Sequence, residues 1–245
     1  MSQIHKQNIL NCFIEKNDKY DILNKEKSYT RYARSYSMDY KKIPMTVLLI
    51  SINTIIFFIL TFQGPTESAE FLLSKGASFV PAIINDGEYY RIVTSMFLHF
   101  GFGHLVNNMI TLALIGSRLE KVIGSVKFLI IYLFGGLCGN ILSMWEDIRK
   151  NIFHVSAGAS GAVFGIIGGL LYVTIRNRNT HVGEQNLTIR DMVIMVGIML
   201  YLGFTSTGVD NMAHLGGLLS GFIATIILYR GPKKIARKEE WYERR

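Results

Sequence analysis

The sequence has little charge and few cysteines, and each shortage excludes a class of protein. Only 18% of its 245 residues are charged, 49% are hydrophobic, and the mean hydropathy is positive at +0.27. This balance is too apolar for an ordinary soluble domain and predicts a membrane protein with several spans. The two cysteines, Cys12 in a polar stretch and Cys138 in an apolar one, belong to different compartments, so we expect no disulfide.

The sequence also lacks the features of a cleaved signal peptide. Residues 1–42 are polar and have no short apolar core followed by small residues, so the first span is expected to act as an uncleaved anchor. The net charge of +8 lies mainly in this arm and in residues 231–245. Because both basic segments flank apolar spans, they favour contact with the lipid bilayer, and nucleic-acid binding is not expected.

Six apolar runs are long enough to cross, or nearly cross, a hydrocarbon core about 30 Å thick. They cover residues 43–62, 104–119, 126–144, 160–175, 189–204 and 212–229. We therefore expect an all-α membrane protein built as a six-transmembrane-helix bundle. The first connection, residues 63–98, is too long for a structureless loop, so short helices in the outer membrane interface are expected there.

The positions of the basic residues predict the orientation of the bundle. All but four of the 26 Lys and Arg residues lie in the two terminal segments or around the second and fourth connections; the exceptions are Lys75, Arg91, Arg149 and Lys150. By the positive-inside rule both termini are then cytoplasmic. The expected organisation is a cytoplasmic arm at 1–42, a six-span domain at 43–230 in the plasma membrane, and a basic cytoplasmic tail at 231–245.

Four polar residues stand at the outer ends of predicted spans. Ser160 begins the fourth span, His214 begins the sixth, and His104 with Asn108 begins the second. In the predicted topology all three helices enter from the outer face, so the four side chains lie at similar depth. Polar side chains at membrane depth usually face a bundle interior or water and mark functional sites.

Each of these residues also has a simpler explanation when it is taken alone. Ser160 is followed by glycines at four-residue spacing and can be one more small residue in a helix contact. His214 can bond a backbone carbonyl, and Asn108 can join two helices. Their common depth favours one shared site over three separate structural roles.

A serine and a histidine at one site predict acyl-transfer chemistry. A serine hydroxyl becomes a nucleophile when a neighbouring base takes its proton, and histidine titrates in the range suited to that role. Asn108, His104 and the backbone N–H groups at the start of the fourth span can donate to the oxyanion. Asp210 lies one helical turn before His214, in a loop, which makes it a doubtful third member, so a dyad is expected.

Two other kinds of site are excluded by spacing. The segment Gly158-Ala159-Ser160-Gly161 is not a G-x-S-x-G nucleophile elbow, because the second glycine directly follows the serine. His99 and His104 are five residues apart, which separates them by roughly 140° around a helix, and no cysteine or carboxylate ligand falls nearby. We therefore expect neither a soluble hydrolase fold nor a metal site.

The motifs that carry these residues resemble those of the rhomboid family of intramembrane serine proteases. The matching pieces are "GEYYR", "HFGFGHLVNNM", "GSRLEKVIG", "GASG" and "AHLGGLLSG", in family order over about residues 43 to 230. The resemblance implies that Ser160 is the nucleophile, that His214 is the base, and that Asn108 and His104 stabilise the oxyanion. It also implies that Gly158 keeps the loop open for the scissile carbonyl, and that His99 is structural.

The resemblance further implies cleavage of transmembrane protein substrates near a membrane surface, without a cofactor. Two positions depart from the family pattern: Tyr90 stands where tryptophan is common, and Phe164 stands where tyrosine is common. Neither change removes a chemical group that the reaction needs. Glu120, near the cytoplasmic end of the second span, is expected to be a structural hydrogen-bond partner and not an acid catalyst.

Two further functions compete with proteolysis. A rhomboid-like bundle can bind or chaperone membrane proteins without cutting them, and a transporter can use His104 and His214 as proton relays. The second is disfavoured because no charged pathway crosses the inner half of the bundle. The sequence indicates no particular oligomeric state.

Overall fold

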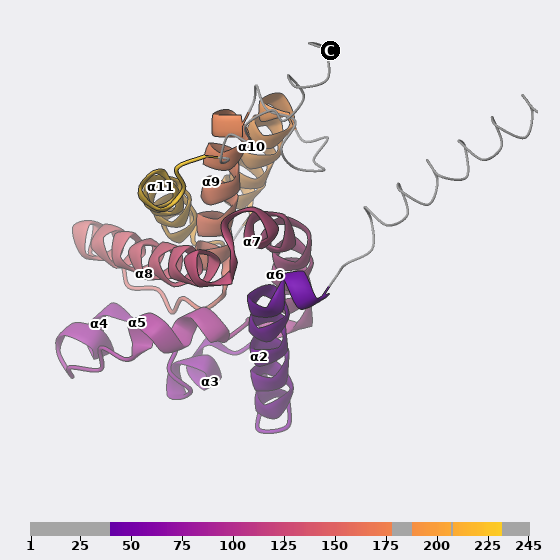
Figure 1. The fold of residues 1–245 in the computed structure, drawn as a ribbon. Helices are drawn as coiled ribbons and strands as arrows, with labels where there is room; N and C mark the ends of the chain where they lie inside the picture. Colours follow the sequence, from indigo (N-terminus) through magenta and orange to yellow (C-terminus); the bar gives the residue numbers. More distant parts are fainter. Residues whose placement is uncertain (1–39, 178–187, 207, 232–245) are drawn as a thin grey trace, which may run out of the picture. The chain divides into compact units, whose positions relative to one another are not determined.

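The computed structural model describes residues 40–177, 188–206 and 208–231. Within these ranges every regular element is a helix, and one isolated antiparallel bridge joins Ser78 to Ser156. The predicted basic arm and tail lie outside the described residues except at their inner ends. The elements, labelled in Figure 1, are η1 Tyr40–Lys42, α2 Pro44–Thr61, α3 Ala69–Ser74, α4 Val80–Ile84, α5 Arg91–Thr94, η2 Ser95–Phe97, α6 Gly101–Thr111, η3 Leu112–Gly116, α7 Ser117–Ile123, α8 Ser125–Lys150, α9 Ser160–Asn177, α10 Ile189–Thr205 and α11 Asn211–Leu228.

All six predicted apolar runs are helical, which confirms the all-α membrane fold. Four of the helices, α2, α8, α9 and α11, are long and apolar enough to cross a membrane. The helical pair Arg91–Phe97 and Gly101–Ile123, bent by 88°, adds a fifth candidate span. The fifth predicted run, residues 189–204, forms α10, which at 17 residues is the shortest of the set. Short spans are tolerated where neighbouring helices shield their ends.

Two predicted spans have longer helices than expected. The second begins at Gly101 and continues through the π-helical turn η3 into α7. The third, α8, runs to Lys150 instead of residue 144 because Arg149 and Lys150 each form a 2.8 Å ion pair with Glu146 one turn earlier. Asn151 then adopts a left-handed conformation with φ of 53° and ends the helix.

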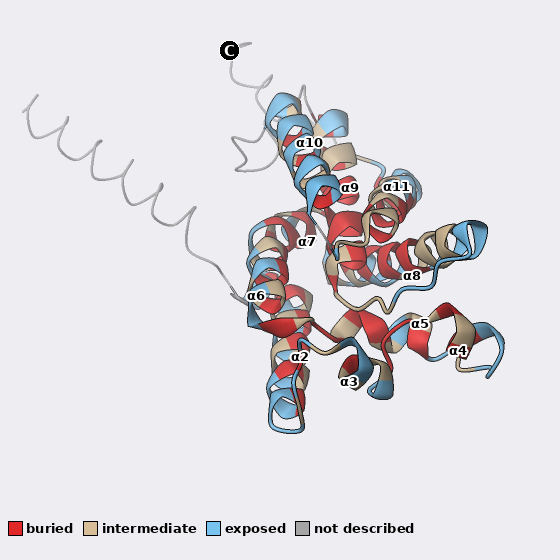
Figure 2. Cartoon of the chain, turned by 180° about the vertical axis from the view of Figure 1, so that it is seen from behind, coloured by how far each residue is buried: buried red, intermediate tan, exposed pale blue. Residues whose placement is uncertain are grey.

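The centre of the bundle is α9, which packs against α8 and α11. Most of its residues are buried, as the red ribbon of α9 in Figure 2 shows. Its contact with α11 is made by backbone, since a Cβ atom on Gly217 would overlap the carbonyl of Gly161. Small residues permit this approach, and helices in lipid associate mainly through such close packing.

A buried carboxylate joins the C-terminal part of the second predicted span to the start of the first. Glu120 in α7 accepts hydrogen bonds from the backbone N–H groups of Met45 and Thr46 at 2.9 and 2.7 Å, and from the Thr46 hydroxyl at 2.6 Å. These are donors at the N-terminus of α2, where negative charge is favourable. Glu120 is therefore structural, as expected from the sequence.

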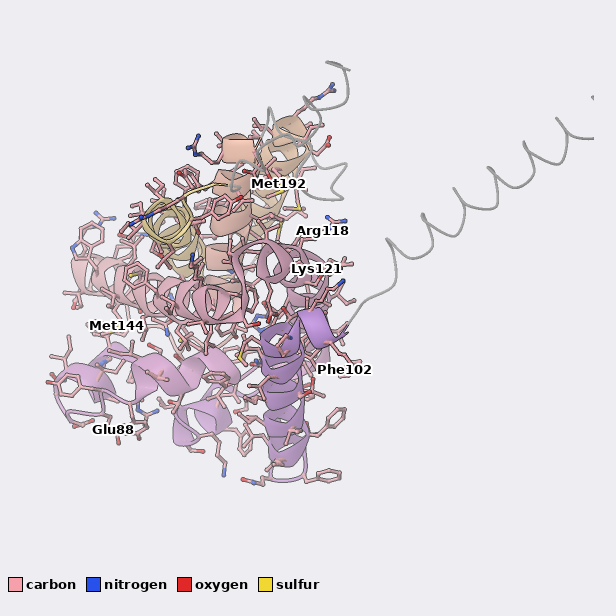
Figure 3. The ribbon with its side chains drawn as sticks, viewed as in Figure 1. Glu88, Phe102, Arg118, Lys121, Met144 and Met192 are labelled. Atoms are coloured by element: carbon pink, nitrogen blue, oxygen red, sulfur yellow. The ribbon has the colours of Figure 1, made fainter. Side chains whose placement is uncertain are left out.

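The first connection folds into the short helices α3, α4 and α5, as predicted. Arg91 is buried among them and donates from Nη1 to the carbonyls of Leu73 and Ala77 at 2.6 and 3.0 Å. Its Nε atom pairs with Glu88, which is labelled in Figure 3. One guanidinium thus joins the segment around α3 to the segment that leads into α5.

We expect Glu120→Ala to lower the free energy of unfolding by about 3 kcal/mol, because it leaves buried donors of α2 without an acceptor. The change would be measured as a lower Tm in detergent micelles by differential scanning fluorimetry. Asp86→Ala, at an exposed carboxylate, is the matched control. Equal Tm values for the two variants would contradict the structural role of Glu120.

Candidate active site

Ser160 is the first residue of α9 and follows a segment without helix, residues 152–159. This segment pairs with the first connection: Ser78 and Ser156 exchange backbone hydrogen bonds of 2.8 and 2.9 Å. Closer to the serine, the Gly158 N–H donates to the Ser95 carbonyl at 2.9 Å. The Ala159 N–H donates to His99 Nε2 at 3.5 Å. The loop that delivers Ser160 is therefore fixed from several sides.

Gly158 occupies a position that only glycine can fill. Its φ of 149° lies where side chains are strained, and a Cβ atom would lie 2.7 Å from Cε1 and 3.0 Å from Nε2 of His104. The same Cβ position is 3.6 Å from the Ser160 hydroxyl oxygen. The His104 ring and the Ser160 hydroxyl therefore both lie close to Gly158.

His214 is buried in the first turn of α11. Its ring stacks on Phe164 with 4.3 Å between centroids and 12° between planes. Phe164 lies four residues after Ser160 on α9, so the imidazole contacts α9 one turn beyond Ser160. Among the described residues His214 Nδ1 has no hydrogen-bond partner, and the ring packs flat against Phe164.

Asp210, the doubtful third member, does not bond the imidazole. It is the N-cap of α11, and one carboxylate oxygen accepts from the Ala213 N–H at 2.9 Å. The other accepts from the hydroxyls of Ser143 and Ser156 at 2.6 and 2.7 Å. Asp210 therefore joins the start of α11 to α8 and to the loop that precedes Ser160.

His104 and Asn108 lie one turn apart on α6. The His104 ring makes an edge-to-face contact with His99, with 5.3 Å between centroids. Asn108 is buried and donates from Nδ2 to the His104 carbonyl at 3.1 Å, so its hydrogen bond stays within α6. An amide nitrogen carries two hydrogens, so one donor remains for a ligand.

Sequence reasoning missed residues that hold the serine loop. Asn140 is buried in α8 and donates to the Ile92 carbonyl at 2.7 Å and to the Ser95 hydroxyl at 3.0 Å. Ser95 in turn accepts from Gly158. A polar Asn140 within an apolar run is the signal that could have pointed to this network. No three His, Cys, Asp or Glu side chains gather as a metal site in the part of the chain that the structure describes.

Comparison with known proteins identifies the family. Residues 86–231 match the Rhomboid domain. The chain belongs to the rhomboid family. It is 37% identical over 185 residues to Rhomboid protease GluP of Bacillus subtilis (strain 168), covering 75% of this chain and 34% of that protein.

Two other rhomboid relatives are also similar in sequence to this chain. RHOMBOID-like protein 7 of Arabidopsis thaliana is 38% identical over 172 residues, which are 69% of this chain and 52% of that protein. Putative rhomboid protease YdcA of Bacillus subtilis (strain 168) is 27% identical over 184 residues, which are 75% of this chain and 88% of that protein. The chain spans about a third to a half of the length of several of these relatives.

We expect Gly158→Ala to lower the free energy of unfolding by about 2 kcal/mol, because it combines a strained φ with a contact against the His104 ring. Adding His104→Ala should restore the part that is due to the ring and leave the part that is due to the backbone. Gly197→Ala is the control, since its Cβ would meet no atom within 4 Å. Thermal unfolding that cannot distinguish Gly158→Ala from Gly197→Ala would refute this geometry.

Proposed function

We propose that this rhomboid-family protein is an intramembrane serine endopeptidase that hydrolyses peptide bonds in or next to the transmembrane segments of membrane-protein substrates. Ser160 is the nucleophile and His214 is the base. The observation that carries the proposal is the stack of Phe164 on His214. It puts the imidazole against α9 one helical turn after Ser160, which supports the proposed pairing of the two side chains.

The reaction follows from the groups at this site. His214 takes the proton of the Ser160 hydroxyl as the oxygen attacks the carbonyl carbon of the substrate. The tetrahedral intermediate collapses when the imidazolium gives that proton to the leaving amine, which breaks the C–N bond. A water molecule, deprotonated by the same imidazole, then attacks the acyl ester and releases the second product and free Ser160.

The oxyanion of the intermediate needs hydrogen-bond donors, and we assign three kinds to this role. The first is the backbone N–H at the start of α9, where the helix dipole is positive. The second is the His104 ring, which lies against Gly158. The third is the remaining N–H of Asn108. Each donor of this type is typically worth on the order of a hundred- to a thousandfold in rate.

The proposed orientation puts both termini in the cytoplasm and opens the site to the outer face of the plasma membrane. The support is the charge asymmetry of the connections. Ser160 and His214 both begin their helices, so they share one face, and Glu120 lies toward the other. With this orientation the arm at 1–42 and the tail at 231–245 flank a membrane domain at 43–230.

We expect Ser160→Ala to abolish cleavage, with a loss of about a thousandfold or more, because no other hydroxyl takes the place of the nucleophile. The measurement is co-expression with a panel of tagged single-span proteins, together with labelling of purified protein by a fluorophosphonate probe. Ser74→Ala, in the first connection, is the control and should cleave and label as wild type does. Equal labelling of wild type and Ser160→Ala would contradict the proposal. Full biological activity of Ser160→Ala would instead favour a binder that does not cut.

The orientation predicts the behaviour of reporter fusions. Alkaline phosphatase fused after residue 153, in the third connection, should be active, because phosphatase folds only outside the cytoplasm. The same reporter fused at Gly124 or after residue 231 should be inactive, whereas a fluorescent protein at those two points should be bright. An active phosphatase after residue 231 would reverse the proposed topology.

A further inference from the structure

One carboxylate connects three segments that surround the proposed dyad. Asp210 caps α11 through the Ala213 N–H, and its second oxygen accepts from Ser143 in α8 and from Ser156 in the serine loop. The backbone of Asp210 takes part as well, since its carbonyl accepts the His214 N–H at 3.2 Å. Both the side chain and the main chain of this residue therefore fix the first turn of α11.

The bonds of Asp210 run to the two segments that carry the proposed dyad, the loop before Ser160 and the first turn of α11. Ser156 lies four residues before Ser160 and is held on its other side by the paired hydrogen bonds to Ser78. His214 lies four residues after Asp210, in the helical turn that Asp210 caps. A shift of this carboxylate would move the serine loop and the histidine helix relative to each other. Their relative placement decides whether the hydroxyl and the imidazole can exchange a proton.

We propose that Asp210 is a positioning residue of the active site, which sets the distance between Ser160 and His214 by clamping the serine loop and α8 to the start of α11. This inference rests on the proposed protease function. Asp210 acts through the hydroxyls of Ser143 and Ser156 and not through the imidazole. The clamp depends on hydrogen-bond geometry, so a neutral side chain of the same shape that keeps the contacts should preserve it.

Two substitutions of Asp210 test its hydrogen bonds from Ser143 and Ser156 separately from its helix cap and from its negative charge. Asp210→Ser keeps an N-cap acceptor for the Ala213 N–H, but its side chain is too short to reach Ser143 and Ser156. Asp210→Asn keeps the length: its oxygen can cap α11, and its amide nitrogen can donate to the two hydroxyls. Asp86→Ser, at an exposed carboxylate of the first connection, is the matched control.

The experiment measures initial cleavage rates of a tagged single-span substrate in proteoliposomes, per active site titrated by saturating fluorophosphonate. We expect Asp210→Ser to lower kcat by about tenfold to a hundredfold with KM changed less than about twofold, and Asp86→Ser to match wild type. Asp210→Asn should stay within about threefold of wild type with an unchanged pH profile. The double variant Ser143→Ala and Ser156→Ala should reproduce Asp210→Ser, and combining it with Asp210→Ser should add no further loss.

The other outcomes overturn the inference. A wild-type kcat per active site in Asp210→Ser, with only a lower Tm, would make Asp210 a stability residue alone. An Asp210→Asn variant as slow as Asp210→Ser, with a shifted pH profile, would mean that the charge acts on the histidine. If wild type cleaves and labels, either result removes only the positioning role. If wild type does neither, the proposed function fails and the inference fails with it.

Discussion

The arrangement of the site depends on the close contact between the backbones of α9 and α11. In lipid, helices gain little from burying apolar surface against each other, so packing decides which faces meet. The carbonyl of Gly161 lies where Gly217 has only hydrogens; Gly161 directly follows Ser160, and Gly217 lies three residues after His214. Because the helices touch at this level, Phe164 of one can stack on His214 of the other. A larger residue at the contact would separate the two proposed reacting groups.

The first connection has a structural role that its position in the sequence does not reveal. Residues 152–159 are not helical, although they lead into a buried helix, and backbone groups at that depth need partners from the protein. The connection supplies them through Ser78, Ser95 and His99. Arg91 keeps the connection folded by bonding two of its carbonyls. The length of the connection is thus explained by its function as a support for the serine loop.

The six helices could be predicted from the apolar runs, but their ends could not. The end of α8 depends on ion pairs with Glu146 and on the conformation of Asn151, which are local effects that hydropathy does not contain. For the site, motif and depth predicted Ser160, His214, His104 and Asn108, and their catalytic roles stay predictions. The bonds from Asn140 to Ile92 and from Ser156 to Asp210 join residues 48 and 54 positions apart. Such contacts depend on how the helices pack, so the sequence marks Asn140 as an unusual polar residue in an apolar run but does not show its partners.

Glu120 and Asp210 have the same structural role at opposite ends of the bundle. Glu120 accepts from the N-terminus of α2, and Asp210 accepts from the N-terminus of α11; both also accept hydroxyls. Helix N-termini have donors without partners, and lipid cannot satisfy them. Because each carboxylate is occupied in this way, neither is available to orient His214. The imidazole stacks on Phe164 instead, which agrees with the proposed dyad and gives no support for a triad.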